Sequence, residues 1–138
     1  MPVKLSLRIA AAIMLLHTIG HTMGALTSNQ APNARVAAVI AGMEREHFDF
    51  MGRSASIALF YNGYGIGMIL VLVLVSILLW LLSVTPVKSM ILAMGIFLVL
   101  TAINEFIYFF PLASVMSLIA GVLTLLALQP SNSKPSAS

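Results

Sequence analysis

The stretch IGMILVLVLVSILLWLL, residues 66–82, contains no charged residue and decides the class of the fold. A helix needs about 20 predominantly apolar residues to cross the hydrocarbon core of a bilayer. The mainly apolar run around this stretch extends from Ala55 to Leu82, which is longer than one crossing requires. We therefore expect a membrane-spanning helix that tilts or begins outside the hydrocarbon.

The composition of the whole chain also favours a membrane environment. Of its 138 residues, 60% are hydrophobic and 8% are charged, whereas soluble domains carry about 25% charged residues. The absence of cysteine excludes disulfides, thiolate metal sites and cysteine nucleophiles. The net charge of +3 comes from scattered basic residues, so nucleic acid is not an expected partner.

Four apolar stretches approach the length of a membrane-spanning helix, which predicts an all-α membrane protein with a four-helix transmembrane bundle. Pro86 and Pro111 separate the last three stretches, because proline lacks the N–H that a continuing helix needs. The short connections favour antiparallel neighbours. The expected transmembrane domain covers residues 1–129, with spans at about 5–26, 55–82, 88–108 and 112–129, and the polar tail 130–138 is expected to be disordered.

The basic residues predict the orientation of the spans. One side of the four-span arrangement carries Lys4, Arg8, Lys88 and Lys134, whereas acidic residues balance the arginines on the other side. The positive-inside rule then places both termini in the cytoplasm of a multi-pass protein of the bacterial inner (plasma) membrane. Lys4 and Arg8 also resemble the start of a signal peptide. Because the apolar run continues past His17 to spanning length, we expect a retained helix.

Residues 33–52, between the first two spans, show a different pattern. Apolar residues recur there at helical spacing, together with His47. Arg45, Asp49 and Arg53 form a row of alternating charge. The pattern predicts an amphipathic interfacial helix at the outer membrane surface or over the mouth of the bundle, with Asn33 as its N-cap.

Polar side chains interrupt the apolar spans at positions that share helix faces. His17 and His21 lie one turn apart, and the nearby Gly20-x-x-x-Gly24 spacing lets another helix approach this face. Glu105 is the one acidic residue within a predicted span, and such a residue is a functional candidate by default. The fourth span has its own small, polar face, made by Ser114, Ser117, Gly121 and Thr124.

The predicted depths of these groups favour an outward-facing polar pocket. A rise of about 1.5 Å per residue places His21, Glu105 and Asn62 in the outer half of the bundle. A buried carboxylic acid and imidazole can exchange protons near neutral pH, so Glu105, His21 and His17 are the candidate catalytic groups for a small lipophilic molecule. The expected substrate-binding residues are Asn62, Tyr108, His47 and Glu44.

Two other interpretations of these residues stay open, and the sequence does not decide whether the protein is an enzyme. In the first, the protein is a non-catalytic membrane subunit or scaffold whose intramembrane polar groups only hold helices together. In the second, it binds a metal through histidine and glutamate spacings known from zinc and di-metal sites. The ligands would be His17, His21, Glu44, His47 and Glu105. Only one Glu-x-x-His repeat is present, so we expect no metal or other cofactor.

Three segments together resemble small uncharacterised four-span bacterial membrane proteins: the first span with its histidines and glycines, EREHFDFMGRSAS at residues 44–56, and NGYGIG at residues 62–67. This resemblance implies the topology and no activity. The plan is also similar in outline to sterol-isomerase-type and terpene-cyclase-type membrane enzymes, although the chain is shorter and lacks their motifs. The expected partners are the lipid bilayer, a lipophilic small molecule, and a second copy or another membrane protein.

Overall fold

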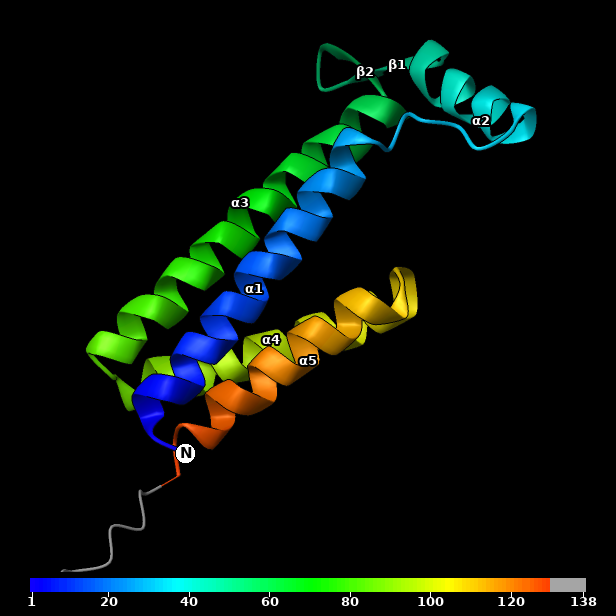
Figure 1. The fold of residues 1–138 in the computed structure, drawn as a ribbon. Helices are drawn as coiled ribbons and strands as arrows, with labels where there is room; N and C mark the ends of the chain where they lie inside the picture. The colour runs from blue at the N-terminus through cyan, green and yellow to red at the C-terminus, as the bar shows by residue number, and fades with distance from the viewer. Residues whose placement is uncertain (130–138) are drawn as a thin grey trace, which may run out of the picture. The chain divides into compact units, whose positions relative to one another are not determined.

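The computed structural model describes residues 1–129, and this part of the chain is predominantly helical (Figure 1). The predicted tail 130–138 lies outside the described residues. In chain order the elements are α1 (Val3–Leu26), α2 (Ala34–Arg45), β1 (His47–Phe50), β2 (Arg53–Ser56), α3 (Ile57–Val84), α4 (Lys88–Tyr108) and α5 (Pro111–Leu126). The helical class predicted from the sequence is therefore confirmed, with the addition of a short hairpin.

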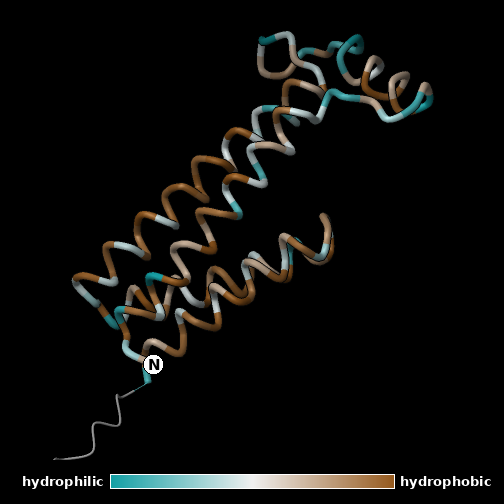
Figure 2. Tube along the Cα trace, in the orientation of Figure 1, coloured by the Kyte–Doolittle hydropathy of each residue, from teal (hydrophilic) through white to brown (hydrophobic). Residues whose placement is uncertain are grey.

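Three of the helices, α1, α3 and α4, are long and apolar enough to cross a membrane. Figure 2 shows hydrophobic residues running along much of their length. The fourth apolar helix, α5, has 16 residues, which corresponds to about 24 Å at the α-helical rise. This is shorter than the hydrocarbon core of about 30 Å, so three spans follow from helix length and a fourth does not.

The helix boundaries follow the proline signals in the sequence. The predicted span 88–108 coincides with α4, and Pro86 lies in the connection before it. Pro111 occupies the first turn of α5, where its missing N–H leaves no hydrogen bond unmade and its fixed φ suits the helix. The predicted spans 5–26, 55–82 and 112–129 differ from α1, α3 and α5 by a few residues at their ends.

The contacts divide the chain into two compact units, and the boundary falls within α1 and within α3. Among the described residues, one unit comprises residues 1–17 together with 72–129, and the other comprises Thr18–Val71. We call them the bundle unit and the hairpin unit.

In the bundle unit, α4 and α5 pack closely because two of their contact positions are glycines, Gly95 on α4 and Gly121 on α5. A Cβ atom on Gly121 would lie 3.1 Å from Leu98 Cβ and 3.2 Å from the backbone nitrogen of Val99. On the same interface, the buried Ser114 hydroxyl donates to the carbonyl of Ala102 at 2.8 Å. These contacts bring the Glu105 end of α4 beside the first turns of α5.

In the hairpin unit, the predicted interfacial helix 33–52 is wrong beyond Arg45. Asn33 caps α2 as expected, since its side-chain oxygen accepts from the Val36 N–H at 3.0 Å. The chain then forms the antiparallel hairpin β1–β2, so Arg45, Asp49 and Arg53 do not form a helical row. The sequence HFDF alternates polar and apolar residues and precedes Gly52, and this period of two fits a strand better than a helix.

Candidate functional site

Three helices of the bundle unit bring polar side chains together at one buried place, which we call the His17 cluster: His17, Glu105 and Ser117. His17 comes from the middle of α1, Glu105 from the last turn of α4, and Ser117 from the middle of α5. Their exposed fractions are 5%, 7% and 0%. The cluster is therefore a buried polar site among apolar helices.

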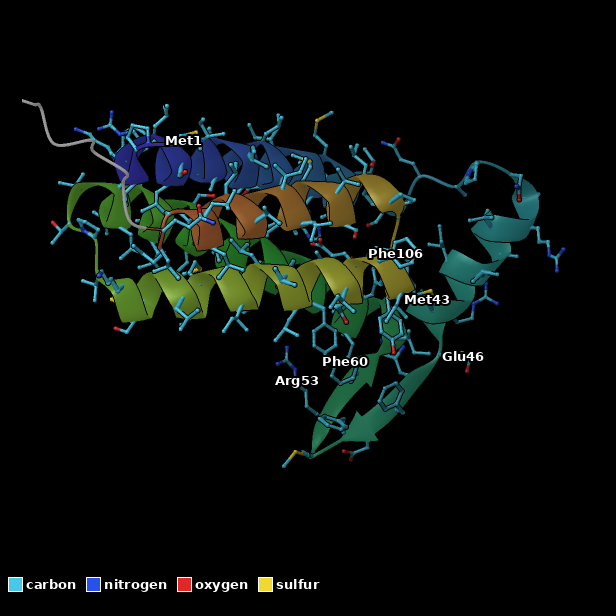
Figure 3. The ribbon with its side chains drawn as sticks, turned by 90° about the horizontal axis from the view of Figure 1, so that it is seen from below. Met1, Met43, Glu46, Arg53, Phe60 and Phe106 are labelled. Atoms are coloured by element: carbon cyan, nitrogen blue, oxygen red, sulfur yellow. The ribbon has the colours of Figure 1, made fainter. Side chains whose placement is uncertain are left out.

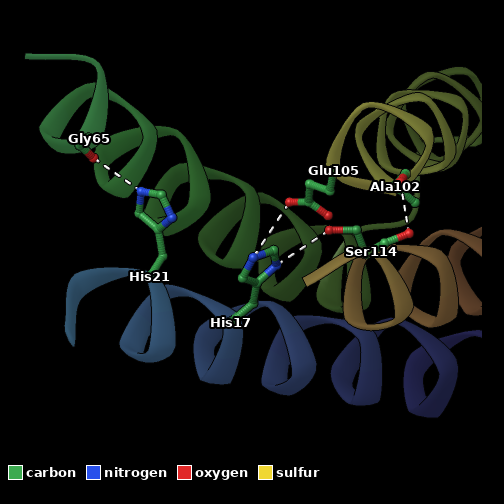
Figure 4. A network of polar contacts seen from close by, with 7 residues as sticks. His17, His21, Gly65, Ala102, Glu105 and Ser114 are labelled. Carbon is green, nitrogen blue, oxygen red and sulfur yellow. Dashed lines mark hydrogen bonds and ion pairs between the residues drawn. The ribbon is translucent and has the colours of Figure 1, made fainter. Parts of the chain in front are cut away.

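The imidazole of His17 joins the other two side chains (Figure 4). Its Nε2 atom lies 3.5 Å from Oε1 of Glu105, and its Nδ1 atom lies 3.3 Å from the Ser117 hydroxyl. When the Nε2 proton points to the carboxylate, Nδ1 is the acceptor and Ser117 donates to it. Ser117 therefore holds the ring in place through Nδ1, and its hydroxyl can serve either tautomer because it both donates and accepts.

One carboxylate oxygen of Glu105 is left over in this arrangement. Oε2 is buried and has no hydrogen-bond partner among the described residues. Buried polar atoms are nearly always hydrogen-bonded, and each exception asks for an explanation. The Ser117 hydroxyl also interacts with the Glu105 carboxyl group, without the geometry of a hydrogen bond to Oε2.

The structure brings together two of the three predicted catalytic residues. His17 and Glu105 meet, whereas His21 belongs to the hairpin unit, where its Nε2 atom lies 3.3 Å from the carbonyl oxygen of Gly65 (Figure 4). Because a carbonyl only accepts, His21 carries its proton on Nε2 in this contact.

The four predicted substrate-binding residues lie outside the His17 cluster. Tyr108 ends α4 with 74% of its surface exposed, so its side chain points away from the cluster. The other three are exposed residues of the hairpin unit: Asn62 on α3, Glu44 on α2 and His47 on β1. The Nδ1 atom of His47 donates to the Arg45 carbonyl at 2.9 Å. His47 also lines a shallow, open depression of about 290 Å³ with Phe48, Asp49 and Ser54. The predicted outward-facing pocket at Glu105 stays a prediction.

Ser117 was not expected among the site residues. The signal for it was present, because Ser114, Ser117, Gly121 and Thr124 form a polar face at helical spacing in the fourth apolar stretch. All four are buried. Only the fold shows that Ser117, and not its neighbour Ser114, contacts His17.

Residues 1–129 contain no ligand set for the metal site that the sequence left open. Nowhere in this part of the chain do three or more His, Asp or Glu side chains come close enough to hold a metal ion. The His17 cluster contributes one imidazole and one carboxylate, and protein zinc sites use at least three protein ligands.

Comparisons of this chain with models of protein families, with curated proteins and with solved structures find no match. The resemblance to small four-span bacterial membrane proteins therefore stays a prediction. Any statement about function depends on the chemistry of the His17 cluster.

Proposed function

We propose that this is a four-span protein of a bacterial inner membrane, with both termini in the cytoplasm, whose His17 cluster binds a small lipophilic molecule and exchanges a proton with it. The observation that carries this proposal is the buried Oε2 atom of Glu105, which has no hydrogen-bond partner among the described residues. An ionisable residue inside a membrane-spanning helix is costly and is a candidate functional site by default.

The arrangement of the cluster supports a defined proton transfer. The protonated Glu105 donates from Oε2 to an oxygen or nitrogen acceptor on the bound molecule. The negative charge that remains on the carboxylate is stabilised at Oε1 by the N–H of His17, 3.5 Å away in the structure. Ser117 can donate to Nδ1 of His17 while the Nε2 proton faces the carboxylate, so its contact is compatible with this stabilisation. The reverse transfer returns the proton from the bound molecule to Oε2.

The surroundings of the cluster favour an apolar molecule with one polar group. Glu105 lies on α4, which is apolar enough to be a membrane span, and a molecule that reaches it from the bilayer must itself dissolve in lipid. A carbonyl or similar acceptor on a hydrocarbon body would satisfy Oε2 and leave its apolar part among the helix side chains. The rival interpretation is a scaffold in which Glu105 only joins α1, α4 and α5.

Dicyclohexylcarbodiimide is a suitable probe, because it is small and lipophilic and reacts only after taking a proton from a carboxylic acid. The proton moves from Glu105 to a carbodiimide nitrogen, and the carboxylate oxygen bonds to the central carbon. The O-acylisourea then rearranges to a stable N-acylurea, so the protein gains the mass of one carbodiimide and loses nothing. We expect mass spectrometry of the full chain in membranes to find this adduct on Glu105.

The other three acidic residues provide an internal control. Glu44, Glu46 and Asp49 lie in the hairpin unit and are exposed. They should react with a water-soluble carbodiimide, which should leave Glu105 unmodified. Glu105→Gln should lose the lipophilic adduct while keeping the helix content and elution volume of the native protein. If the folded native protein shows no adduct on Glu105, lipophilic molecules do not reach the cluster and the scaffold interpretation replaces this proposal.

A further inference from the structure

The hairpin presents large apolar side chains to its surroundings at its tip. Met51 is 93% exposed, and Phe48 and Phe50 are 42% and 51% exposed. Phe48 and Phe50 share one face of β1, together with Ala55 and Arg53, their cross-strand partners on β2. We call Phe48, Phe50 and Met51 the apolar tip. The opposite face is polar and carries His47, Asp49 and Ser54.

The methionine at the turn occupies a conformation that disfavours it. Met51 and Gly52 both have positive φ, 54° and 80°, as a two-residue turn of type I′ requires. Asn followed by Gly is the usual choice for such a turn, whereas an unbranched apolar residue gains nothing from the left-handed region. The Asp49 side chain supports the turn by accepting from the Gly52 N–H at 2.8 Å. A methionine that is both strained and exposed suggests that its side chain meets an apolar medium.

The hairpin is joined directly to a helix that is long enough to cross a membrane. β2 ends at Ser56 and α3 begins at Ile57, without a linker. Figure 3 shows Phe60 of the first α3 turn beside the hairpin, and its ring lies 6.1 Å from that of Phe48 and 5.3 Å from that of Phe50. These contacts tie the orientation of the hairpin to the start of α3.

The length of α3 sets the position of this junction relative to the lipid. Its 28 residues span about 42 Å, whereas the hydrocarbon core is about 30 Å thick. The extra length places an end of the helix among the headgroups. The exposed Tyr61 and Tyr64 near the start of α3 are of the type that anchors helices at that level. The hairpin continues from this same end.

We infer that the apolar tip inserts into the headgroup region of the same bilayer that α3 crosses, as a membrane anchor. Arg53 lies opposite Phe50 in the register, where its guanidinium can reach a lipid phosphate while its stem lies along apolar surface. The inference depends on α3 crossing a membrane and is independent of the proton transfer at the His17 cluster.

Tryptophan fluorescence tests this insertion, because Trp80 is the one tryptophan of the chain. In a Trp80→Phe background, Met51→Trp places the reporter on the apolar tip and Ser54→Trp places a matched reporter on the polar face. The full chain is reconstituted into phosphatidylcholine–phosphatidylglycerol vesicles whose acyl chains carry bromine near the headgroup. We expect brominated lipid to quench most of the emission of Met51→Trp and iodide in the buffer to quench that of Ser54→Trp.

The other outcomes of the same experiment contradict the inference. Quenching of Met51→Trp by iodide and not by brominated lipid would place the tip in water. Protection of Met51→Trp from both quenchers would place it against protein, either a second copy of this chain or another partner. Circular dichroism of each variant verifies the helix content, and Phe50→Trp gives a second reporter on the apolar tip if Met51→Trp does not fold.

Discussion

The Nε2 atom of His17 lies 3.5 Å from Oε1 of Glu105, and both side chains are buried. An N–H···O hydrogen bond in a protein is typically about 2.7–3.2 Å long, so this pair is close but not tightly bonded. Ser117 occupies the second nitrogen of the imidazole at 3.3 Å. The geometry leaves the carboxyl group held on one oxygen, with the other oxygen available to a third group.

The first prediction concerns the coupling of this pair. We expect the effects of His17→Ala and Glu105→Gln on the free energy of unfolding to be non-additive. The interaction free energy should be about 0.5–3 kcal/mol, which is the range measured for residues in contact. The free energies of unfolding of the two single variants and the double variant in detergent give the coupling.

Ser76 provides the control for this cycle. It is buried, and its hydroxyl donates to the Leu72 carbonyl at 2.9 Å within its own helix. Ser76→Ala combined with Glu105→Gln should therefore be additive. Additive behaviour of His17→Ala with Glu105→Gln would mean that the two groups do not stabilise each other.

The second prediction concerns the packing of α4 against α5. Gly121→Ala should destabilise the protein by about 1–3 kcal/mol, the usual cost of adding a methyl group to a filled interior. The new Cβ would lie 3.1 Å from Leu98 Cβ and 3.2 Å from the Val99 nitrogen. The nitrogen is backbone and Cβ is bonded directly to the backbone, so neither atom can move aside by a change of rotamer.

Gly63 is the matched control, because a Cβ there meets nothing within 4 Å. Gly63→Ala should leave the free energy of unfolding unchanged or raise it by up to about 1 kcal/mol, since alanine favours a helix more than glycine does. Equal effects of the two substitutions, measured by chemical unfolding in the same detergent, would show that α4 and α5 are not in close contact at Gly121.

The sequence predicted the helices well, because their signals are long and redundant. The stretch 66–82 within the second span has no polar residue except Ser76. Pro111 favours a helix that begins at that residue, because proline suits the first helical position. The segment after Arg45 was mispredicted as helix because apolar residues spaced for a helix overlapped with a short alternating run. Over four residues the two periods are hard to distinguish, and the turn at Gly52 decides between them.

The candidate site was predicted only in part, for a reason of geometry. The polar positions on single helices were visible, since His17, Glu105 and Ser117 each interrupt an apolar run. His17 and His21 lie one turn apart, and the rotation and depth of α1 relative to α4 decide which of them contacts Glu105. A shift of one turn exchanges His17 for His21, and hydropathy does not fix a depth to that precision.

The third prediction tests the four-span topology. Since the chain contains no cysteine, single introduced cysteines can be labelled without background. We expect Val87→Cys, between α3 and α4, and Gln129→Cys, after α5, to react with a membrane-impermeant maleimide from the cytoplasmic side. Phe110→Cys, between α4 and α5, and Ser54→Cys, on the polar face of the hairpin, should react from the opposite side. Labelling of positions 110 and 129 from the same side would show that α5, with its 16 residues, does not cross the membrane.

The fourth prediction separates the stability of the hairpin from its contact with lipid. Met51→Asn should stabilise the turn by about 1 kcal/mol, because asparagine tolerates the left-handed conformation that costs most side chains 1–2 kcal/mol. Hydrogen exchange measured by mass spectrometry in detergent should therefore be slower over residues 47–56 than in the native protein. Gly52→Ala is the opposite control: at φ 80° alanine is strained, so exchange over the same residues should be faster.

In vesicles, the same substitution should weaken the contact of the hairpin with the bilayer. With Phe50→Trp as reporter in the Trp80→Phe background, Met51→Asn should reduce quenching by brominated lipid, because it replaces the most exposed apolar side chain of the tip with an amide. A variant with a more stable turn and a weaker lipid contact would show that Met51 is present for the membrane and not for the fold. If Met51→Asn leaves the lipid quenching unchanged, Met51 does not contribute to the anchor, and its unfavourable backbone conformation has no membrane explanation.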